Sequence, residues 1–110
     1  MQQNNAGGPI EPVYETREMR VTAYCPCEKC CEEWADGITA SGHVIKKGDK
    51  FCAADKSIAF GTAVNIPGYG EVLILDRGGL IKGDRLDVYF DTHQEAISWG
   101  VKHLKVRIEQ

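Results

Sequence analysis

The sequence predicts an all-β domain, a six-stranded β-barrel with one or two short helices. Short runs of apolar or alternating residues recur along the chain and are separated by glycine-rich turns. Glycine accounts for 12 of the 110 residues, which is above the average of about 7%. Only one segment has the capping pattern of a helix. A closed barrel can hold six short strands without leaving exposed edges.

The first five expected strands follow one another between residues 19 and 90. An alternating pattern with β-branched residues predicts the first strand, and short apolar runs predict those that follow. The run 71–75 is nearly all apolar, so we expect a central strand that is buried on both faces. The strands expected in this part of the chain are 19–24, 51–54, 62–66, 71–75 and 85–90.

One helix is expected between the fifth strand and the last strand. Thr92, or the aspartate before it, can cap its N-terminus, and Glu95 lies three residues after Thr92, as in a capping box. An apolar side at residues 96–99 and a glycine at the C-terminal stop position, Gly100, complete the pattern. The alternating run 104–108 then predicts the sixth strand.

The composition indicates one globular domain preceded by a polar arm. Hydrophobic residues make up 43% of the chain and charged residues 26%, and a chain of this length buries about two-thirds of the surface that it exposes when unfolded. We expect residues 1–18 to form a flexible polar arm and residues 19–110 to form the domain. The arm lacks the apolar segment of a signal peptide, and no apolar run approaches the roughly 20 residues of a membrane span.

The balance of charge argues against a nucleic-acid-binding protein. The chain has 13 basic and 16 acidic side chains, with a net charge of −3. Proteins that bind nucleic acids need a surplus of lysine and arginine to neutralise phosphates. We therefore expect no nucleic acid among the partners.

Three aspartates lie at the ends of, or within, the expected strands. Asp55 follows the second strand, Asp76 follows the run 71–75, and Asp87 lies within the strand 85–90. A carboxylate among apolar residues carries a desolvation cost unless it accepts hydrogen bonds or holds a proton. One aspartate beside a glycine is commonly a turn residue. Three of them near strand ends, with glycine-rich segments nearby, indicate a functional site.

The order of short motifs along the chain resembles the three-aspartate (3D) domain family. The most specific part is the run Asp-x-Gly-Gly-x-Ile-Lys-Gly from Asp76 to Gly83, with Asp87 eleven residues after the first aspartate. The resemblance covers about residues 19–109 and implies a double-psi β-barrel, similar to the catalytic barrel of membrane-bound lytic transglycosylase A. The other shared motifs are Thr22-Ala23-Tyr24, Thr39-Ala40-Ser41-Gly42, Ala53-Ala54-Asp55, Gly61-Thr62, Gly68-Tyr69-Gly70 and Leu86-Asp87-Val88-Tyr89-Phe90.

The resemblance implies a lytic transglycosylase-like enzyme that acts on the glycan strands of bacterial peptidoglycan. Such an enzyme cleaves the bond between N-acetylmuramic acid and N-acetylglucosamine while the C6 hydroxyl of the muramic acid closes a 1,6-anhydro ring. Asp87 would be the general acid and base, with Asp76 and Asp55 in support. One carboxyl can serve both steps because the internal hydroxyl replaces the water that other glycosidases activate. Burial and nearby carboxylates would keep this acid protonated near neutral pH.

Residues around the three aspartates are the candidates for substrate binding. The glycines after Asp76 would let the backbone approach a sugar closely, Lys82 could bind a carbonyl or carboxylate, and Tyr24 could stack on a sugar or hydrogen-bond to it. The family usually has threonine where this chain has Arg77, and we expect this arginine to lower the pKa values of Asp76 and Asp87. The full set expected is Thr22, Tyr24, Gly78, Gly79, Lys82 and Gly83.

Four of the five cysteines fall within residues 25–31, and their state has more than one interpretation. A structural zinc ion is one, because Cys27 and Cys30 form a C-x-x-C pair. Free thiols, or a disulfide between Cys52 and a cysteine of this segment, are the others. The resemblance implies a protein of the bacterial cell envelope or a secreted protein, which favours a disulfide that involves Cys52. The residues that could complete a zinc site are Cys25, Cys31, Cys52 and His43.

Two alternatives differ in class from this enzyme. The barrel could bind glycan without cleaving it, as expansin-like domains do, with the aspartates accepting hydrogen bonds from sugar hydroxyls. The domain could also be a metal- or redox-responsive module whose functional site is the cysteine segment 25–31. The intact glycine-rich run after Asp76 favours catalysis, whereas Arg77 favours binding. We expect a monomer that requires no cofactor.

Overall fold

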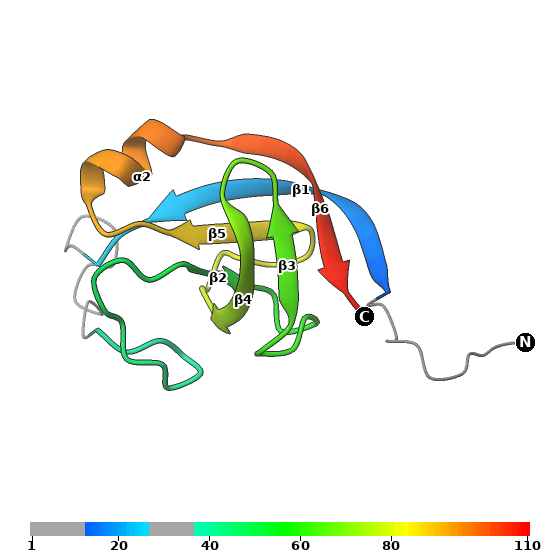
Figure 1. Ribbon diagram of the computed structural model, residues 1–110, viewed down its shortest axis with the longest axis horizontal. Helices are drawn as coiled ribbons and strands as arrows, with labels where there is room; N and C mark the ends of the chain where they lie inside the picture. Colours follow the sequence, from blue (N-terminus) through cyan, green and yellow to red (C-terminus); the bar gives the residue numbers. More distant parts are fainter. Residues whose placement is uncertain (1–12, 27–36) are drawn as a thin grey trace, which may run out of the picture.

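The computed structural model describes residues 13–26 and 37–110, which form a closed barrel of six strands with one helix (Figure 1). Around the barrel the strands follow the order β1-β5-β2-β4-β3-β6. This arrangement confirms the predicted fold class, a six-stranded double-psi β-barrel. The elements are β1 (Tyr14–Tyr24), β2 (Phe51–Ala54), β3 (Ala63–Ile66), β4 (Gly70–Asp76), β5 (Arg85–Tyr89), α2 (His93–Trp99) and β6 (Lys102–Glu109).

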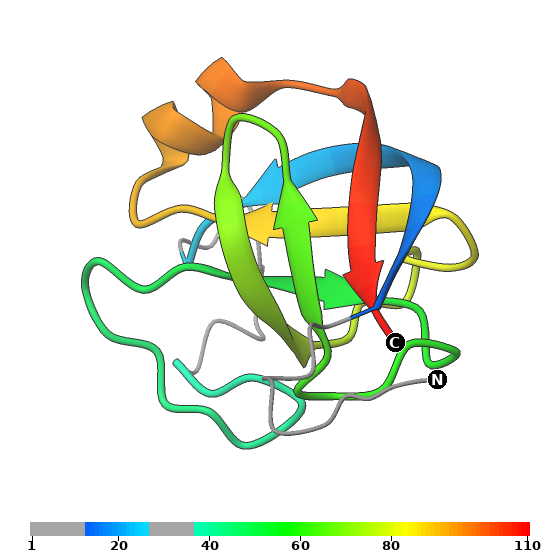
Figure 2. The same cartoon turned by 45° about the vertical axis from the view of Figure 1, so that its right-hand side comes forward.

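Two of the six strand pairs are parallel, and parallel partners cannot be joined by a tight hairpin turn. β1 pairs in parallel with β5, and β2 pairs in parallel with β4. The other four pairs are antiparallel, including the β3–β4 hairpin that lies at the front of Figure 2. The parallel pairing makes neighbours of residues far apart in the sequence, such as Thr22 and Asp87.

β1 begins earlier than the expected strand because its first residues pair with β6. The polar composition assigns residues 14–18 to the arm, but in the structure they lie opposite residues 105–109 in an antiparallel ladder. β6 also extends beyond the expected run, from Lys102 to Glu109. The two ends of the domain therefore stabilise each other through a pairing that neither segment reveals alone.

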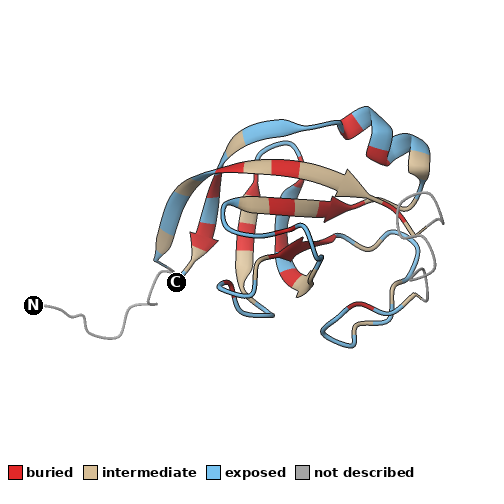
Figure 3. Ribbon diagram, turned by 180° about the vertical axis from the view of Figure 1, so that it is seen from behind, coloured by how far each residue is buried: buried red, intermediate tan, exposed pale blue. Residues whose placement is uncertain are grey.

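Alternate residues of the strands fill the barrel interior, as the alternating colours along β1 and β5 show in Figure 3. Successive side chains of a strand point to opposite faces. Residues such as Val21 and Leu86 therefore enter the core while their neighbours face outward. The core cluster consists of Met19, Val21, Cys52, Ala54, Ile58, Val64, Ile66, Tyr69, Val72, Ile74, Leu86, Val88, Trp99, Val106 and Ile108.

Two apolar side chains that the sequence places in the core are exposed instead. Leu73 of β4 is 44% exposed, whereas its two neighbours are buried. β4 is therefore buried on one face only, because Leu73 points away from the barrel interior. Ile97 of α2 is 58% exposed. This helix has only seven residues and packs through Ala96 and Trp99, which lie three residues apart on one side.

The caps of α2 are those that the sequence predicts. The Thr92 hydroxyl accepts a hydrogen bond from the Glu95 N–H at 3.1 Å, and Gly100 ends the helix with a φ of 70°. Trp99 Nε1 donates to the carbonyl of Val21 at 3.1 Å, which attaches the helix to β1. Within the described ranges, no helix is long and apolar enough to cross a membrane.

Replacing Tyr69 by phenylalanine should destabilise the barrel. The buried Tyr69 hydroxyl lies within hydrogen-bond distance of the carbonyls of Phe51 and Tyr89, which share its one proton. Tyr69→Phe leaves these buried carbonyls without that donor, so we expect the free energy of unfolding to fall by about 1–3 kcal/mol. Urea denaturation followed by circular dichroism measures this change. Tyr14→Phe is the control, because it removes an exposed hydroxyl that donates to Glu71. Equal midpoints for the two variants would contradict the prediction.

Candidate functional site

Four residues on four adjacent strands form a row on the outer surface of the barrel. Thr22 of β1 lies opposite Asp87 of β5, and Asp87 lies opposite Ala53 of β2. Ala53 in turn lies opposite Asp76 of β4. Residues in register project to the same side of a sheet, and Val21, next to Thr22, fills the core. The row therefore faces away from the core, and we call these four residues the carboxylate row.

Asp76 belongs to this row because β4 contains one extra residue. Cys52 of β2 lies opposite Ile74, but the next residue, Ala53, lies opposite Asp76. Leu75 is thus a β-bulge. Ile74 points into the core, so regular alternation would turn Leu75 outward and Asp76 inward. The bulge reverses this and brings Asp76 to the same face as the other aspartate of the row.

The Asp76 carboxylate accepts three hydrogen bonds. Its Oδ2 accepts from the Tyr24 hydroxyl at 2.8 Å. Its Oδ1 accepts from the backbone N–H groups of Ala40 at 2.8 Å and Arg77 at 2.9 Å. These donors come from β1, from the loop 37–50 and from the chain after β4, so they fix the carboxylate from three sides. The Tyr24 hydroxyl, a candidate to bind sugar, here supports Asp76.

Asp87 has a different environment in the same row. The Thr22 hydroxyl donates to its Oδ1 at 3.0 Å. Burial raises the pKa of Asp87 to about 6; the Thr22 hydrogen bond lowers it, the charge of Asp76 raises it, and the charge of Arg85 lowers it. A carboxyl with this pKa can donate a proton and take one back near neutral pH. The two acids of the row are therefore suited to different tasks.

Asp55 lies in the turn after β2, two residues beyond Ala53 of the carboxylate row. Its Oδ2 accepts a hydrogen bond from the Ser57 N–H at 3.1 Å. The Ser57 hydroxyl, followed by backbone N–H groups that include Gly83, holds the pKa of Asp55 below its usual value. Asp55 is therefore ionised at neutral pH, and it links the turn after β2 to the glycine-rich loop. Such a residue can support the site as a fixed charge but not as a proton donor.

The conformation and packing of the loop after β4 require glycine at two positions. A Cβ at Gly78 would lie 2.9 Å from Cγ1 of Ile81, so a larger residue would displace that side chain. Gly83 has a φ of 63°, in the left-handed region that favours glycine. Gly79 has open space around it, and Lys82 is exposed. Two of the three candidate glycines thus have a structural reason that needs no sugar.

Arg77 does not act on Asp87 as the sequence predicts. Its Nη2 donates to the carbonyl of Ile58 at 2.8 Å, and its guanidinium lies 4.0 Å from the ring centroid of Phe60. Arg77 therefore stabilises the turn after β2. The arginine whose charge lowers the pKa of Asp87 is Arg85, which the sequence analysis does not single out.

The loop 37–50 fixes the bulge and Asp76, although the sequence analysis assigns it no role. The Ser41 N–H donates to the carbonyl of Leu75 at 3.3 Å, while the neighbouring Ala40 N–H donates to Asp76. Consecutive N–H groups of one loop thus hold both the bulge and the carboxylate. The sequence feature that could have indicated this role is the motif Thr39-Ala40-Ser41-Gly42. It is part of the family resemblance, but the resemblance does not indicate what the motif does.

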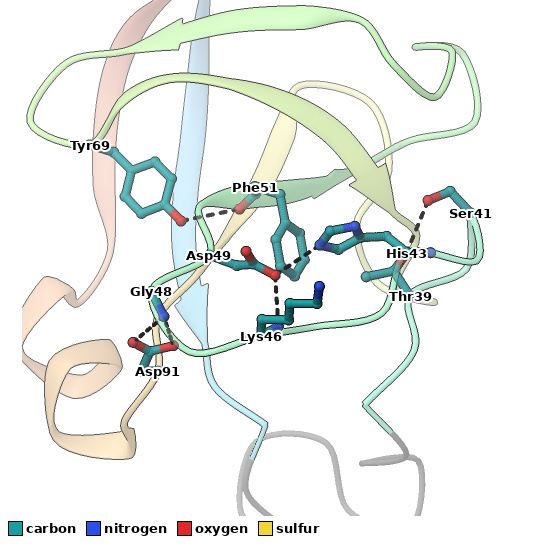
Figure 4. A network of polar contacts seen from close by, with 9 residues as sticks. All are labelled: Thr39, Ser41, His43, Lys46, Gly48, Asp49, Phe51, Tyr69 and Asp91. Carbon is teal, nitrogen blue, oxygen red and sulfur yellow. Dashed lines mark hydrogen bonds and ion pairs between the residues drawn. The ribbon is translucent and has the colours of Figure 1, made fainter.

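A network of polar contacts holds this loop in place (Figure 4). His43 Nε2 lies 2.9 Å from Asp49 Oδ2, which also accepts from the Lys46 N–H at 2.7 Å. The Gly48 N–H donates to both oxygens of Asp91 at 3.0 and 2.8 Å, which connects the loop to the chain between β5 and α2. His43, a candidate zinc ligand, is thereby engaged by a carboxylate.

Three aromatic residues form a second row beside the carboxylate row. Tyr24 and Tyr89 lie opposite each other, two residues beyond Thr22 and Asp87. The ring of Phe51 stacks on Tyr89 with centroids 4.7 Å apart, and both residues are almost completely buried. We call these three residues the aromatic row. It joins the carboxylate row through the Tyr24 hydroxyl, which donates to Asp76.

The predicted disulfide that involves Cys52 is wrong. Cys52 is a free thiol within the barrel core, and burial raises its pKa. Cys25 is also buried, and its Sγ lies 3.7 Å from Nδ1 of His93. In the part of the chain that the structure describes, no group of three or more His, Cys, Asp or Glu is placed to hold a metal ion. The remaining cysteines, Cys27, Cys30 and Cys31, lie outside the described residues.

Comparison with known proteins identifies the family. A family model described as the 3D domain matches residues 50–109, a range that includes all three aspartates. The chain belongs to the 3D domain family. The match runs from the start of β2 to the end of β6.

Relatives of this 3D domain include two proteins of Bacillus subtilis (strain 168). Cell wall-binding protein YocH is 39% identical over 75 residues, which is 66% of this chain and 26% of that protein. Putative cell wall shaping protein YabE is 36% identical over 91 residues, which is 79% of this chain and 21% of that protein. The matched regions thus make up about a quarter of the length of these relatives.

A solved structure shares the fold. The crystal structure of MltA from E. coli is similar with a TM-score of 0.51 and 24% sequence identity. The similar region covers 66% of this chain and 27% of that chain. The likeness shows that this 3D domain and part of MltA have the same barrel fold.

Asp87→Asn should stabilise this 3D domain at neutral pH. The pKa of about 6 in the folded state lies above the value of about 3.9 of an unfolded aspartate. The folded state therefore binds the proton more tightly, and the ionised carboxyl lowers stability as the pH rises from about 4 to about 6. Above pH 6 the free energy of unfolding of Asp87→Asn should exceed that of the wild type by about 3 kcal/mol, and below pH 4 this difference disappears.

Urea denaturation of the wild type and of Asp87→Asn at pH 7.5 and at pH 4 tests this pH dependence. We expect the variant to be more stable only at pH 7.5. Asp84→Asn, which changes an exposed carboxylate, is the control. An Asp87→Asn variant that is less stable than the wild type at pH 7.5 would show that the ionised Asp87 carboxylate does not destabilise the folded state.

Proposed function

We propose that this domain is a lytic transglycosylase-like enzyme of the cell envelope or the cell exterior that acts on peptidoglycan, with Asp87 as its general acid and base. The observation that carries the proposal is the half-buried Asp87 carboxyl in one row with the fixed carboxylate of Asp76, whose charge acts on it. The printed names of the relatives support the cell wall as the target, since one is cell wall-binding and the other a putative cell wall shaping protein. The fold shared with MltA is compatible with this chemistry.

In the first step, Asp87 donates its proton to the glycosidic oxygen while the bond from C1 of N-acetylmuramic acid to this oxygen breaks. The Thr22 hydroxyl contacts Oδ1 and orients the carboxyl for this transfer. Positive charge develops at C1 as the bond breaks, and the carboxylate of Asp76 stabilises it electrostatically. The hydrogen bonds from Tyr24 and Ala40 hold Asp76 in one orientation during this step.

In the second step, Asp87 acts as a base. Its carboxylate takes the proton of the C6 hydroxyl of the same muramic acid, and the oxygen of this hydroxyl forms a bond to C1. The product has a 1,6-anhydro ring, and the released N-acetylglucosamine carries the proton donated in the first step. Asp87 returns to its protonated form without water, so one carboxyl completes the cycle.

A barrel that binds glycan without cleaving it is the second candidate. The relative named as cell wall-binding favours it, because that name describes no cleavage. In this case Asp87 would accept or donate hydrogen bonds to sugar hydroxyls. The two candidates differ in their products, which makes them separable by experiment.

Asp87→Asn should abolish the formation of 1,6-anhydromuramoyl ends. Purified peptidoglycan is incubated with the wild type, with Asp87→Asn and with Glu71→Gln, a control on the exposed start of β4. Mass spectrometry should detect anhydro ends with the wild type and the control. The Asp87 variant should yield at least about 100-fold fewer, as is typical for the loss of a general acid. Binding by the wild type without anhydro ends would support the second candidate, and equal yields from both variants would overturn the role of Asp87.

The rate of cleavage should fall as the pH rises above about 6. The first step needs the protonated form of Asp87, whose pKa is raised to about 6, and the protonated fraction decreases tenfold for each pH unit above this value. Initial rates between pH 4.5 and pH 8.5 at constant ionic strength give this profile. A rate that stays constant up to pH 8 would show that another group donates the proton.

A further inference from the structure

Two arginines face each other beside the carboxylate row. Arg20 of β1 lies opposite Arg85 of β5, two residues before Thr22 and Asp87 on the respective strands. A spacing of two residues places side chains on the same face of a strand, so both arginines share the outer face with the carboxylate row. Both are partly exposed. We call these two residues the arginine pair.

Neither arginine of the pair forms an ion pair among residues 13–26 and 37–110, although the charge of Arg85 acts on the neighbouring Asp87. The only polar contact of either side chain there is from Arg85 Nη1 to the carbonyl of Leu80, at 3.1 Å. The ion pairs found in these ranges are Arg17 with Glu15, Arg17 with Asp84, and His43 with Asp49.

This arrangement is unfavourable for the sheet itself. Like charges directly opposite on neighbouring strands are destabilising, and this chain has 16 acidic side chains that could have supplied a counter-charge. Proteins keep locally unfavourable arrangements mainly where function requires them. Here the pair lies next to the candidate catalytic acid, so the position is a candidate site for an anion from outside the chain.

We propose that the arginine pair is a subsite for a carboxylate of the peptidoglycan substrate. The inference rests on the proposed function and adds the feature of the substrate that is recognised. Guanidinium groups bind carboxylates through paired N–H donors with strong, charge-assisted hydrogen bonds. Sugar hydroxyls carry no negative charge. Peptidoglycan carries carboxylates on its stem peptides, and on the lactyl group of the muramic acid where the stem peptide is absent.

A carboxylate bound to the arginine pair also acts on the reaction. The positive charge of Arg85 lowers the pKa of Asp87. A bound anion neutralises this charge and so increases the protonated fraction of Asp87, which the first step requires. Substrates with a carboxylate are therefore bound more tightly than uncharged glycans. When they are bound, a larger fraction of Asp87 is protonated.

Variants of the arginine pair test the subsite. Arg20→Gln, Arg85→Gln and the double variant are compared with Arg107→Gln on β6. Arg107 is exposed and contacts the ring of Tyr14, and it lies opposite Thr16 of β1, so its change removes the same charge from a position that does not face Arg20 or Arg85. Binding to insoluble peptidoglycan is measured by sedimentation at 0.15 M salt. We expect the double variant to bind at least about tenfold more weakly than the wild type, and Arg107→Gln to bind within about twofold of it.

Modified substrates show whether a carboxylate is recognised and where it comes from. Intact peptidoglycan is compared with peptidoglycan whose carboxyl groups have been amidated, and with glycan strands freed of stem peptides by an amidase. The wild type should prefer carboxylate-bearing material, and this preference should vanish in the double variant. Weaker binding of the stripped strands assigns the carboxylate to the stem peptide, and stronger binding assigns it to the lactyl group, whose carboxylate is freed when the stem peptide is removed. Equal binding shows that the subsite accepts either carboxylate. Equal binding of intact and amidated peptidoglycan by the wild type would overturn the subsite.

The pH profile of cleavage separates this role from a merely structural one. Arg85→Gln removes a charge that lowers the pKa of Asp87, so the alkaline limb of the profile should move to higher pH. Thermal unfolding should show that the arginine variants are at least as stable as the wild type, because the change relieves repulsion. An unchanged limb together with normal binding by the double variant would refute the subsite.

Failure of the subsite and failure of the proposed function give different results. A wild type that binds and cleaves intact peptidoglycan, with arginine variants that behave like Arg107→Gln, leaves the proposed function standing and removes the subsite. A wild type that neither binds nor cleaves any of the three preparations removes both.

Discussion

The extra residue at Leu75 in β4 determines which face of the barrel carries Asp76. Without this bulge, strand alternation would turn Asp76 toward Ile74 and the rest of the core, where an unpaired carboxylate carries a large desolvation cost. With it, Asp76 emerges opposite Ala53, accepts the Tyr24 hydroxyl, and places its charge where it raises the pKa of Asp87. The loop 37–50 stabilises the bulge through the Leu75 carbonyl, so the loop and the bulge depend on each other.

The two acids of the carboxylate row differ through their neighbours rather than through their own chemistry. Asp76 accepts hydrogen bonds from three donors, two of them backbone N–H groups that have no freedom to turn away. Asp87 accepts a hydrogen bond from the Thr22 hydroxyl, and its partial burial raises its pKa. An enzyme that uses a single acid and base needs such a division, because one carboxyl must move a proton while the other remains charged.

The sequence predicted the features that local patterns determine. Alternation located the strands, and the capping residues Thr92 and Gly100 located the helix. The features that it missed depend on contacts between distant segments. These include the pairing of β1 with β6, the bulge in β4, and the contact of Ala40 with Asp76. Cys52 was misjudged for a related reason, since all four residues of β2 are buried and alternation does not show which of them enter the core.

The parallel register of β1 and β5 explains why the outer face is ordered in rows. β1 contains Arg-x-Thr-x-Tyr from Arg20 to Tyr24, and β5 contains Arg-x-Asp-x-Tyr from Arg85 to Tyr89. Parallel pairing matches these two segments position by position, so tyrosine meets tyrosine and arginine meets arginine. Antiparallel pairing about the same centre would have set each arginine opposite a tyrosine and removed the repulsion. The site can therefore be predicted from these two short patterns only when the parallel register of β1 and β5 is known.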